Sequence, residues 1–255
     1  MLRRLIFIPV LLFCLAAFCQ GNHDSLMKYS YLVYNPVGKQ GYYGGTGFFI
    51  KNNKNLFFVT AQHVLDGYDM NDQKLPNFPD TAYIVIHTKT AIYFHTILLA
   101  DIIKKHVNSK AYEHADVYVL PVRIPDTVMV NSIEKFMVPI LDCHTVSQTI
   151  VFGYPVLNSQ PYIILNAPPK EKYSPILNYC YDIEYQEINK IDSFNYPISI
   201  KGDGFGFSGA PIFFEIKNKP VFGGIVSSGT PDTIMMGLRP KYIEYAIKLK
   251  KLNQK

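Results

Sequence analysis

Short stretches of apolar residues, separated by Gly, Pro, Asn and Asp, run through most of the chain. Stretches of this length that are rich in Val, Ile, Tyr, Phe and Thr are typical of β-strands. We expect a first series of strands at 29–34, 47–50, 56–60, 82–88, 92–100 and 117–122. A second series is expected at 149–153, 162–166, 178–185, 212–216 and 221–227. The stretch 125–139 lies between the two series and is predicted to connect them.

One segment near the C-terminus has the periodicity of a helix. Pro240 opens it, and the following residues carry an apolar stripe made by Ile243, Ala246, Ile247 and Leu249. The stripe predicts a helix over 242–252. Many short strands at regular spacing indicate barrels or sandwiches. We therefore predict an all-β protein of two barrels with a C-terminal α-helix.

The first nineteen residues have the pattern of a secretory signal peptide. Arginines at positions 3 and 4 precede an apolar run over 5–18, which is too short to span a membrane. Small residues before Gln20 predict cleavage after Cys19, and hence a secreted or periplasmic protein. The predicted divisions are the signal peptide at 1–19, the first barrel at 20–124, the second barrel at 125–238, and the helix with its tail at 239–255.

Composition and charge exclude some classes of function. The chain has 255 residues, of which 48% are hydrophobic, and a formal net charge of +5 at pH 7. Its lysines are scattered, so we expect no nucleic-acid partner, and no later stretch is apolar and long enough to cross a membrane. The histidines and cysteines show no metal-ligand spacing, so we predict no metal site. Export permits a disulfide between Cys143 and Cys180, and two free thiols are the alternative.

The stretch from 201 to 211 holds four glycines and one serine directly before an apolar strand. Glycines allow sharp turns and positive φ, so we expect Ser208 at the tip of a tight turn with free amide groups around it. A serine held in this way can attack a carbonyl while neighbouring N–H groups hold the oxyanion that forms. A glycine-rich hairpin loop with an incidental serine is the alternative that this stretch alone leaves open.

A serine is a poor nucleophile unless a base takes its proton. His63 directly follows an apolar strand, at a point where the chain is held in place, and is the predicted base. Asp116 heads the strand at 117–122 and is the carboxylate predicted to fix the tautomer of His63. Asp101 is a rival in a similar setting, but the strand after Asp116 is longer and alternates. A histidine capping a strand and an aspartate in a turn are the plainer interpretations.

Three segments, at 60–63, 116–120 and 206–211, together resemble the signatures of the trypsin-like (chymotrypsin-fold) serine peptidases. The order His, Asp, Ser is the order of that fold. Segments at 44–48, 151–155 and 223–229 also resemble its early strand, a strand end common in its bacterial members, and the strand beside the substrate. No cysteine follows His63 or precedes Ser208, so the resemblance is to the bacterial, cystine-poor branch.

The resemblance implies two six-stranded β-barrels and a secreted serine endopeptidase that hydrolyses polypeptide substrates through an acyl-enzyme, without a cofactor. Ser208 would attack the scissile carbonyl, His63 would act first as base and then as acid, and Asp116 would orient His63. The amides of Gly206 and Ser208 would form the oxyanion hole. The specificity pocket would be lined by Gly202, Asp203, Phe205, Ser227, Ser228 and Gly229.

Two positions depart from the best-known members of the family. Digestive members pair a new N-terminal amine with an aspartate directly before the nucleophile, where this chain has Phe207. We expect the ring of Phe207 to order the turn by packing into the second barrel. Gly202 stands where trypsin-type enzymes have the acid of the pocket floor, which predicts small or medium uncharged side chains before the scissile bond. A catalytically silent binding module on the same fold, a pseudo-protease, and an unrelated secreted β-sandwich are the alternative functions.

Overall fold

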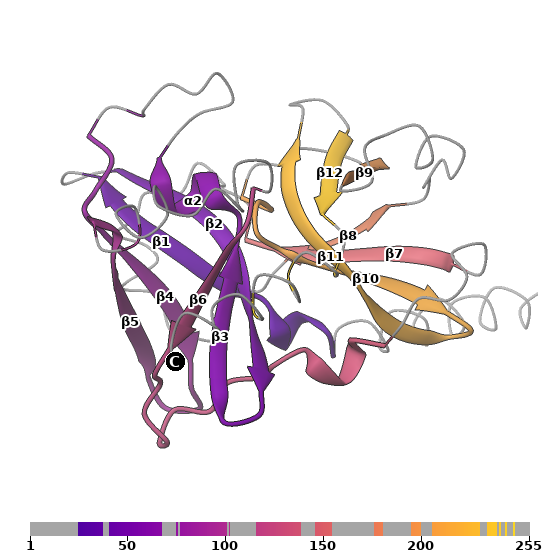
Figure 1. Ribbon diagram of the computed structural model, residues 1–255, viewed down its shortest axis with the longest axis horizontal. Coiled ribbons are helices and arrows are strands. Elements are labelled where there is room, and N and C mark those ends of the chain that lie inside the picture. The colour runs from indigo at the N-terminus through magenta and orange to yellow at the C-terminus, as the bar shows by residue number, and fades with distance from the viewer. Residues whose placement is uncertain are drawn as a thin grey trace, which may run out of the picture.

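The computed structural model describes residues 25–37, 41–67, 75, 77–100, 102, 116–138, 146–154, 176–180, 195–199, 206–229, 234–238, 240, 243 and 247. Within them the chain forms two six-stranded antiparallel sheets, which lie beside each other in Figure 1. The prediction of an all-β protein built from two six-stranded units is confirmed.

The first sheet has the strand order β5-β4-β1-β2-β3-β6. Its strands are β1 (Tyr31–Val37), β2 (Gly41–Asn52), β3 (Asn55–Thr60), β4 (Thr81–His87), β5 (Ile92–Leu98) and β6 (Tyr118–Val122). Gly47 of β2 pairs with Thr60 of β3, and Thr60 pairs with Tyr118 of β6. This register places the end of β3 and the beginning of β6 side by side, so that His63 and Asp116 leave the sheet close together.

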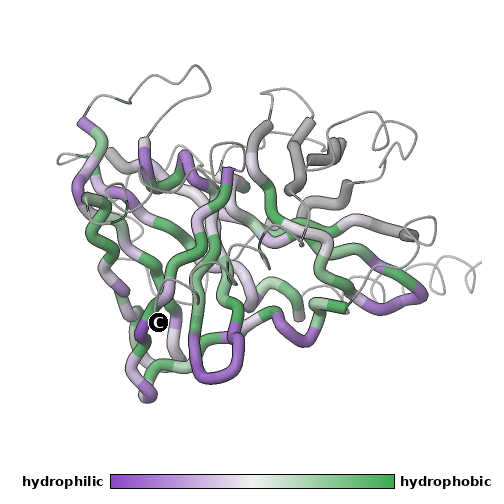
Figure 2. Tube along the Cα trace, viewed as in Figure 1, coloured by the Kyte–Doolittle hydropathy of each residue, from purple (hydrophilic) through white to green (hydrophobic). Residues whose placement is uncertain are grey.

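The second sheet has the strand order β8-β7-β10-β11-β12-β9. Its strands are β7 (Val146–Gly153), β8 (Ile176–Cys180), β9 (Asn195–Ser199), β10 (Pro211–Ile216), β11 (Lys219–Gly229) and β12 (Ile234–Leu238). The hairpin of β10 and β11 forms the centre of this sheet, and Ser208 lies directly before it. Figure 2 shows apolar residues along the middle of this hairpin and polar residues at its turn.

The sequence analysis missed two strands and underestimated a third. β9 contains Pro197, which cannot donate to a ladder, but β9 lies at the edge of the sheet, where that loss is tolerated. β12 reads Ile-Met-Met-Gly-Leu and has few β-branched or aromatic residues. β2 begins well before the expected 47–50. Its glycines have a low strand propensity, so the sequence did not predict this part, but pairing with β1 and β3 on both sides stabilises it. The strand expected at 162–166 lies outside the described residues.

Short helical segments in the described part of the chain were also not expected, since none is long enough to show helical periodicity. They include η1 (Met27–Tyr29), α2 (Gln62–Asp66) and η3 (Glu134–Phe136). Leu99 and Ala100, at the end of the strand predicted over 92–100, are helical as well. Of the helix predicted over 242–252, the structure describes only Ile243 and Ile247, and both are buried and helical, as Pro240 before them is helical. The rest of that helix, and the predicted signal peptide at 1–19, lie outside the described residues. In the part of the chain that the structure describes, no helix is suited by length and hydropathy to cross a membrane.

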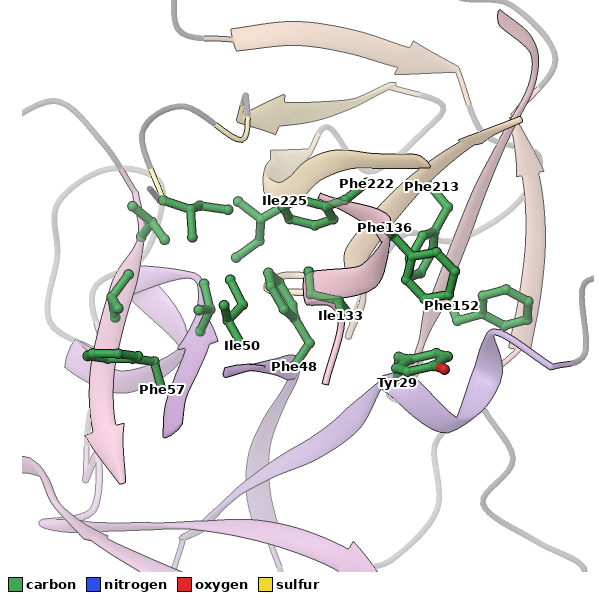
Figure 3. Close-up of a cluster of buried hydrophobic side chains, with 14 of the residues drawn as sticks. Tyr29, Phe48, Ile50, Phe57, Ile133, Phe136, Phe152, Phe213, Phe222 and Ile225 are labelled. Carbon is green, nitrogen blue, oxygen red and sulfur yellow. The ribbon is translucent and has the colours of Figure 1, made fainter. Parts of the chain in front are cut away.

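One apolar cluster joins the two sheets (Figure 3). Phe48 of β2 meets Phe222 of β11 edge-to-face, with ring centroids 5.3 Å apart. Tyr29 of η1 packs on Phe136 of η3 at 5.1 Å, and Phe136 packs on Phe213 of β10 at 5.2 Å. Aromatic pairs at these distances add stability beyond the area that they bury. The cluster fixes the position of one sheet relative to the other, and the candidate site lies at this same junction.

Candidate active site

His63 lies on α2, the single turn of helix that follows β3. Ala61 is extended and starts the helix, and Gly67, with φ of 71°, ends it. A side-chain hydrogen bond from Asn35 Nδ2 to the carbonyl of Val64, at 2.9 Å, ties the helix to β1. Both ends of this short helix are thereby defined, and its position on the first sheet is fixed.

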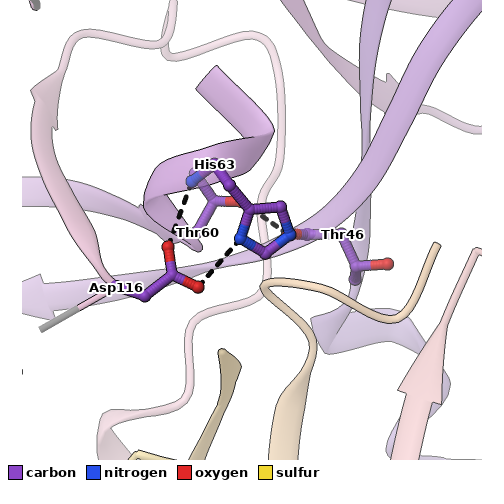
Figure 4. A network of polar contacts seen from close by, with 4 residues as sticks. All are labelled: Thr46, Thr60, His63 and Asp116. Carbon is purple, nitrogen blue, oxygen red and sulfur yellow. Dashed lines mark hydrogen bonds and ion pairs between the residues drawn. The ribbon is translucent and has the colours of Figure 1, made fainter. Parts of the chain in front are cut away.

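Asp116, two residues before β6, holds His63 by two hydrogen bonds (Figure 4). The ring Nδ1 of His63 lies 2.8 Å from Asp116 Oδ2, and the backbone N–H of His63 donates to Asp116 Oδ1 at 3.0 Å. An ionised carboxylate can only accept, so the Nδ1 of His63 carries the proton and Nε2 is left as the free acceptor. This is the tautomer that a general base needs to take a proton at Nε2.

The electrostatic surroundings of His63 favour its charged form. Burial lowers the pKa of the imidazole, but the hydrogen bond and charge of Asp116, together with the charge of Asp66, outweigh burial and raise the pKa of His63 above its ordinary 6.5. The side chains of His63 and Asp116 are 36% and 29% exposed. The imidazole is therefore accessible from outside, as a group that exchanges protons with a substrate must be.

The turn that carries Ser208 is tight, as the glycines predict. Gly206 and Gly209 have φ of 88° and 86°. The N–H of Ala210 donates to the carbonyl of Phe207 at 2.7 Å, and the N–H of Gly209 donates to the carbonyl of Val226, on β11, at 2.7 Å. Ser208 is half-buried at the tip of this turn. A bond within the turn thus holds the residue before the serine, and a bond to the second sheet holds the residue after it.

Contacts across the junction bring this turn to the segment that leads into His63. The N–H of Thr46, on β2, donates to the carbonyl of Ser208 at 2.8 Å. A Cβ added to Gly209 would lie 2.9 Å from the backbone nitrogen of Ala61, two residues before His63. The structure therefore gathers the Ser208 turn and the His63–Asp116 pair at one place, where the two sheets meet.

Phe207 packs into the second sheet, as expected. Its side chain is 2% exposed. A Cβ added to Gly153, at the end of β7, would lie 2.6 Å from the ring of Phe207, so the ring occupies the space that a side chain at Gly153 would need. The residue directly before the serine is thus held by packing.

No protein-family model and no curated protein matches the sequence. Solved structures of proteases do match by shape. The serine endoprotease from Yersinia pestis aligns with a TM-score of 0.50 over 89% of this chain and 65% of that chain, at 13% identity. A variant of the HtrA-type protease AlgW with tripeptide aligns with a TM-score of 0.50 over 87% of this chain and 60% of that chain, at 9% identity. The protein has the trypsin-like fold. At these identities, the likeness concerns the fold alone.

Of the six residues predicted to line the specificity pocket of this trypsin-like fold, the structure describes the three on β11. Ser227 is buried on β11, and Ser228 and Gly229 complete that strand and pair with Met236 and Met235 of β12. Gly202, Asp203 and Phe205 lie outside the described residues, as do the rival acid Asp101 and Cys143. Among the residues that the structure describes, no group of three or more His, Cys, Asp or Glu side chains could hold a metal ion.

Sequence reasoning missed three residues that shape this site. Asp66 lies one turn after His63 and adds negative charge to its surroundings. The hydroxyl of Thr46 donates to the carbonyl of Gly206, in the Ser208 turn, and accepts from the backbone N–H of Tyr154. Only the position of Thr46 within a glycine-rich segment, between Gly45 and Gly47, could have drawn attention to it, because glycines permit the close approach of another backbone.

Proposed function

We propose that the protein is a serine endopeptidase that hydrolyses peptide bonds through an acyl-enzyme formed on Ser208. The observation that carries the proposal is the two-point hold of Asp116 on His63, beside a turn that presents Ser208. A carboxylate, an imidazole in the correct tautomer and a hydroxyl on a fixed turn are the three parts that acyl transfer by serine requires.

The first half of the reaction forms the acyl-enzyme. Nε2 of His63 takes the proton of Ser208 Oγ while Oγ attacks the scissile carbonyl carbon. The carbonyl oxygen becomes an oxyanion, which the amides of Gly206 and Ser208 stabilise. The tetrahedral intermediate then collapses, and the imidazolium of His63 gives its proton to the leaving amine. The carboxylate of Asp116 stabilises the charged His63 throughout.

The second half returns the enzyme to its starting state. Water takes the place of the leaving amine, and His63 removes a proton from it as it attacks the acyl carbon. The second tetrahedral intermediate uses the same oxyanion hole. On its collapse the carboxylate product leaves, and His63 returns the proton to Ser208 Oγ. No step needs a cofactor.

The sequence supports three finer parts of the proposal. A basic and then apolar segment at 1–19 supports export, with cleavage after Cys19, to the periplasm or outside the cell. The lack of cysteines beside His63 and Ser208 supports a member of the bacterial, cystine-poor branch. Gly202, in place of a pocket-floor acid, supports cleavage after small or medium uncharged side chains.

A peptide-library experiment tests this function. The chain is expressed from Gln20 and incubated with a library of peptides whose fragments are identified by mass spectrometry, with Ser208→Ala as the matched control. We expect cleavage after small or medium uncharged residues that Ser208→Ala abolishes. Cleavage after Arg or Lys that is lost in Asp203→Ala would contradict the predicted specificity. If neither protein cleaves any peptide, the trypsin-like binding module becomes the better account.

A further inference from the structure

Besides the pairing of β2 with its neighbouring strands, Thr46 takes part in four hydrogen bonds, three of which reach elements at the Ser208 turn or beside it. Its N–H donates to the carbonyl of Ser208 at 2.8 Å, and its Oγ1 donates to the carbonyl of Gly206 at 2.7 Å. Its Oγ1 also accepts from the N–H of Tyr154, directly after β7, at 2.9 Å. Its carbonyl accepts from the hydroxyl of Thr60 at 2.7 Å. One residue of the first sheet therefore binds two elements of the second.

The hydroxyl of Thr46 bridges two backbone groups, donating to one and accepting from the other. A hydroxyl has a single hydrogen to donate and lone pairs with which to accept. Here the hydrogen goes to Gly206 and a lone pair receives Tyr154. Thr46 is fully buried, so bulk water does not compete for either bond. If the hydroxyl were removed, two backbone groups in a buried place would lose their partner, and unmade buried bonds are costly.

The Thr46 hydroxyl binds the carbonyl of a glycine, the residue type with the greatest backbone freedom. Gly206 has a φ of 88°, a conformation that glycine both enters and leaves easily. The carbonyls of Phe207 and Ser208 are held by Ala210 and by the backbone of Thr46. The carbonyl of Gly206 is held by a side chain, the hydroxyl of Thr46. With all three bonds in place, each of these three carbonyls accepts a hydrogen bond from within the protein.

We propose that Thr46 is a positioning residue for the oxyanion hole. By holding the carbonyl of Gly206, its hydroxyl fixes the backbone between the two proposed oxyanion donors, the N–H groups of Gly206 and Ser208. The inference rests on the proposed function. Oxyanion stabilisation depends on donors that are fixed before the charge appears, because reorganising them during the reaction costs free energy. Without the Thr46 hydroxyl, the turn still carries Ser208 and the protein still binds substrate, but it stabilises the transition state less well.

Three variants separate the hydroxyl from the bulk of the side chain. Thr46→Val keeps the shape and loses the hydroxyl, Thr46→Ser keeps the hydroxyl and loses the methyl, and Thr46→Ala loses both. The substrate is a peptide that the wild-type protein cleaves, and the inhibitor is a trifluoromethyl ketone built on the same peptide. This inhibitor forms a tetrahedral adduct with serine and so reports on the oxyanion hole.

For Thr46→Val we expect kcat to fall by about 10²-fold, with KM within about threefold of wild type. A displaced Gly206 backbone weakens a donor of the oxyanion hole, and complete loss of one donor costs ~10²–10³ in kcat. Affinity for the trifluoromethyl ketone should fall by the same factor as kcat/KM, since both report binding of the transition state. Thr46→Ser should keep kcat within about threefold of wild type. Thr46→Ala replaces Thr46→Val if the valine variant does not fold, and the same split between kcat and KM is expected.

Ser30→Ala is the matched control. The hydroxyl of Ser30 is also buried and donates to a backbone carbonyl of the second sheet, that of Phe152, at 2.9 Å. Its loss should lower the melting temperature while leaving kcat within about twofold. A kcat for Ser30→Ala as low as that for Thr46→Val would show that activity follows general stability, and would overturn the inference.

Other outcomes also overturn the inference. One is a Thr46→Val protein with wild-type kcat and wild-type affinity for the trifluoromethyl ketone. Another is failure of both Thr46→Val and Thr46→Ala to fold at a temperature at which Ser30→Ala is folded, which would assign the hydroxyl to folding. Failure of the proposed function is recognised differently. In that case the wild-type protein itself cleaves no more than Ser208→Ala does, and the inference falls with the function.

Discussion

Gly209 packs so closely on Thr46 that a Cβ at Gly209 would overlap the carbonyl oxygen of Thr46. Gly209 directly follows the serine in the turn before β10 of the second sheet, whereas Thr46 belongs to the first sheet. Its φ of 86° also lies in the region that L side chains rarely adopt. Space and backbone conformation therefore both require glycine at this position, and the requirement arises where the two sheets meet beside Ser208.

Gly209→Ala is expected to disturb the site more than the rest of the fold. The new methyl meets the carbonyl oxygen of Thr46 and the backbone nitrogen of Ala61, which cannot rotate away, so the turn must shift. Displacement of a reacting group by about 1 Å can cost 10²-fold in rate. We expect kcat/KM for a peptide substrate to fall by at least about 10²-fold. Gly223→Ala is the control, because the three atoms nearest to its methyl would all belong to the ring of Phe214. Wild-type kcat/KM for Gly209→Ala would show that the close packing does not position Ser208.

Loss of any member of the proposed triad should remove nearly all activity. Ser208→Ala and His63→Ala are each expected to lower kcat by roughly 10⁴–10⁶, because triad members act as a unit. Asp116→Asn should cost about 10⁴, since an amide that donates to His63 fixes the wrong tautomer. Steady-state kinetics on one peptide, with circular dichroism as a check of folding, give the comparison. If Asp101→Asn is the variant that loses activity and Asp116→Asn is not, the assignment of the acid is wrong.

The raised pKa of His63 predicts the pH dependence. A general base must be neutral, so kcat/KM should fall as the pH decreases through the pKa of His63, with a midpoint above 6.5. Asp66→Asn removes a negative charge that favours the imidazolium, so it should move the midpoint to lower pH while Asp116 still orients the ring. The measurement is kcat/KM from pH 5 to 9 at constant ionic strength. A midpoint that stays in place or moves to higher pH in Asp66→Asn would contradict this account of the charges around His63.

The N-terminal amine should play no part in activation. The residue before Ser208 is a buried phenylalanine, whose ring has no charge to pair with an ammonium group. A buried amine without a partner would be strongly unfavourable. A chain that begins at Gln20 and carries extra residues at its N-terminus should therefore titrate with one active site per molecule. An inactive chain that gains activity only after a defined internal cut would refute this prediction.

Phe207→Ala should lower activity, because it removes the packing that orders the turn. Its ring occupies the space beside Gly153, and alanine would leave a cavity there. We expect kcat to fall more than the substrate affinity, and the free energy of unfolding to fall by about 3–5 kcal/mol, as for other buried phenylalanines changed to alanine. Phe214→Ala, at a buried position on β10 away from the turn, is the comparison. Equal losses of kcat in the two variants would contradict a specific role for Phe207.

The sequence was sufficient to predict the parts of the fold and site that depend on local residue type. Short stretches rich in Val, Ile, Tyr, Phe and Thr predict most strands of the first sheet, and the positions of His63 and Asp116 at strand ends predict their pairing. β9 and β12 were not predicted, because pairing with neighbouring strands stabilises them and their own composition is not typical of strands. Thr46 escaped because its importance lies in bonds to residues more than a hundred positions away, such as Gly206 and Tyr154.

Labelling with a fluorophosphonate tests the central claim most directly. This reagent reacts with a serine only when a base removes the proton of the hydroxyl and amides stabilise the resulting oxyanion, so it tests Ser208, His63 and the turn together. The protein is incubated with the reagent, digested and mapped by mass spectrometry, with Ser208→Ala and His63→Ala in parallel. We predict stoichiometric modification of Ser208 in the wild-type protein and none in either variant. An unlabelled wild-type protein, or a label on another serine that His63→Ala does not affect, would contradict the account.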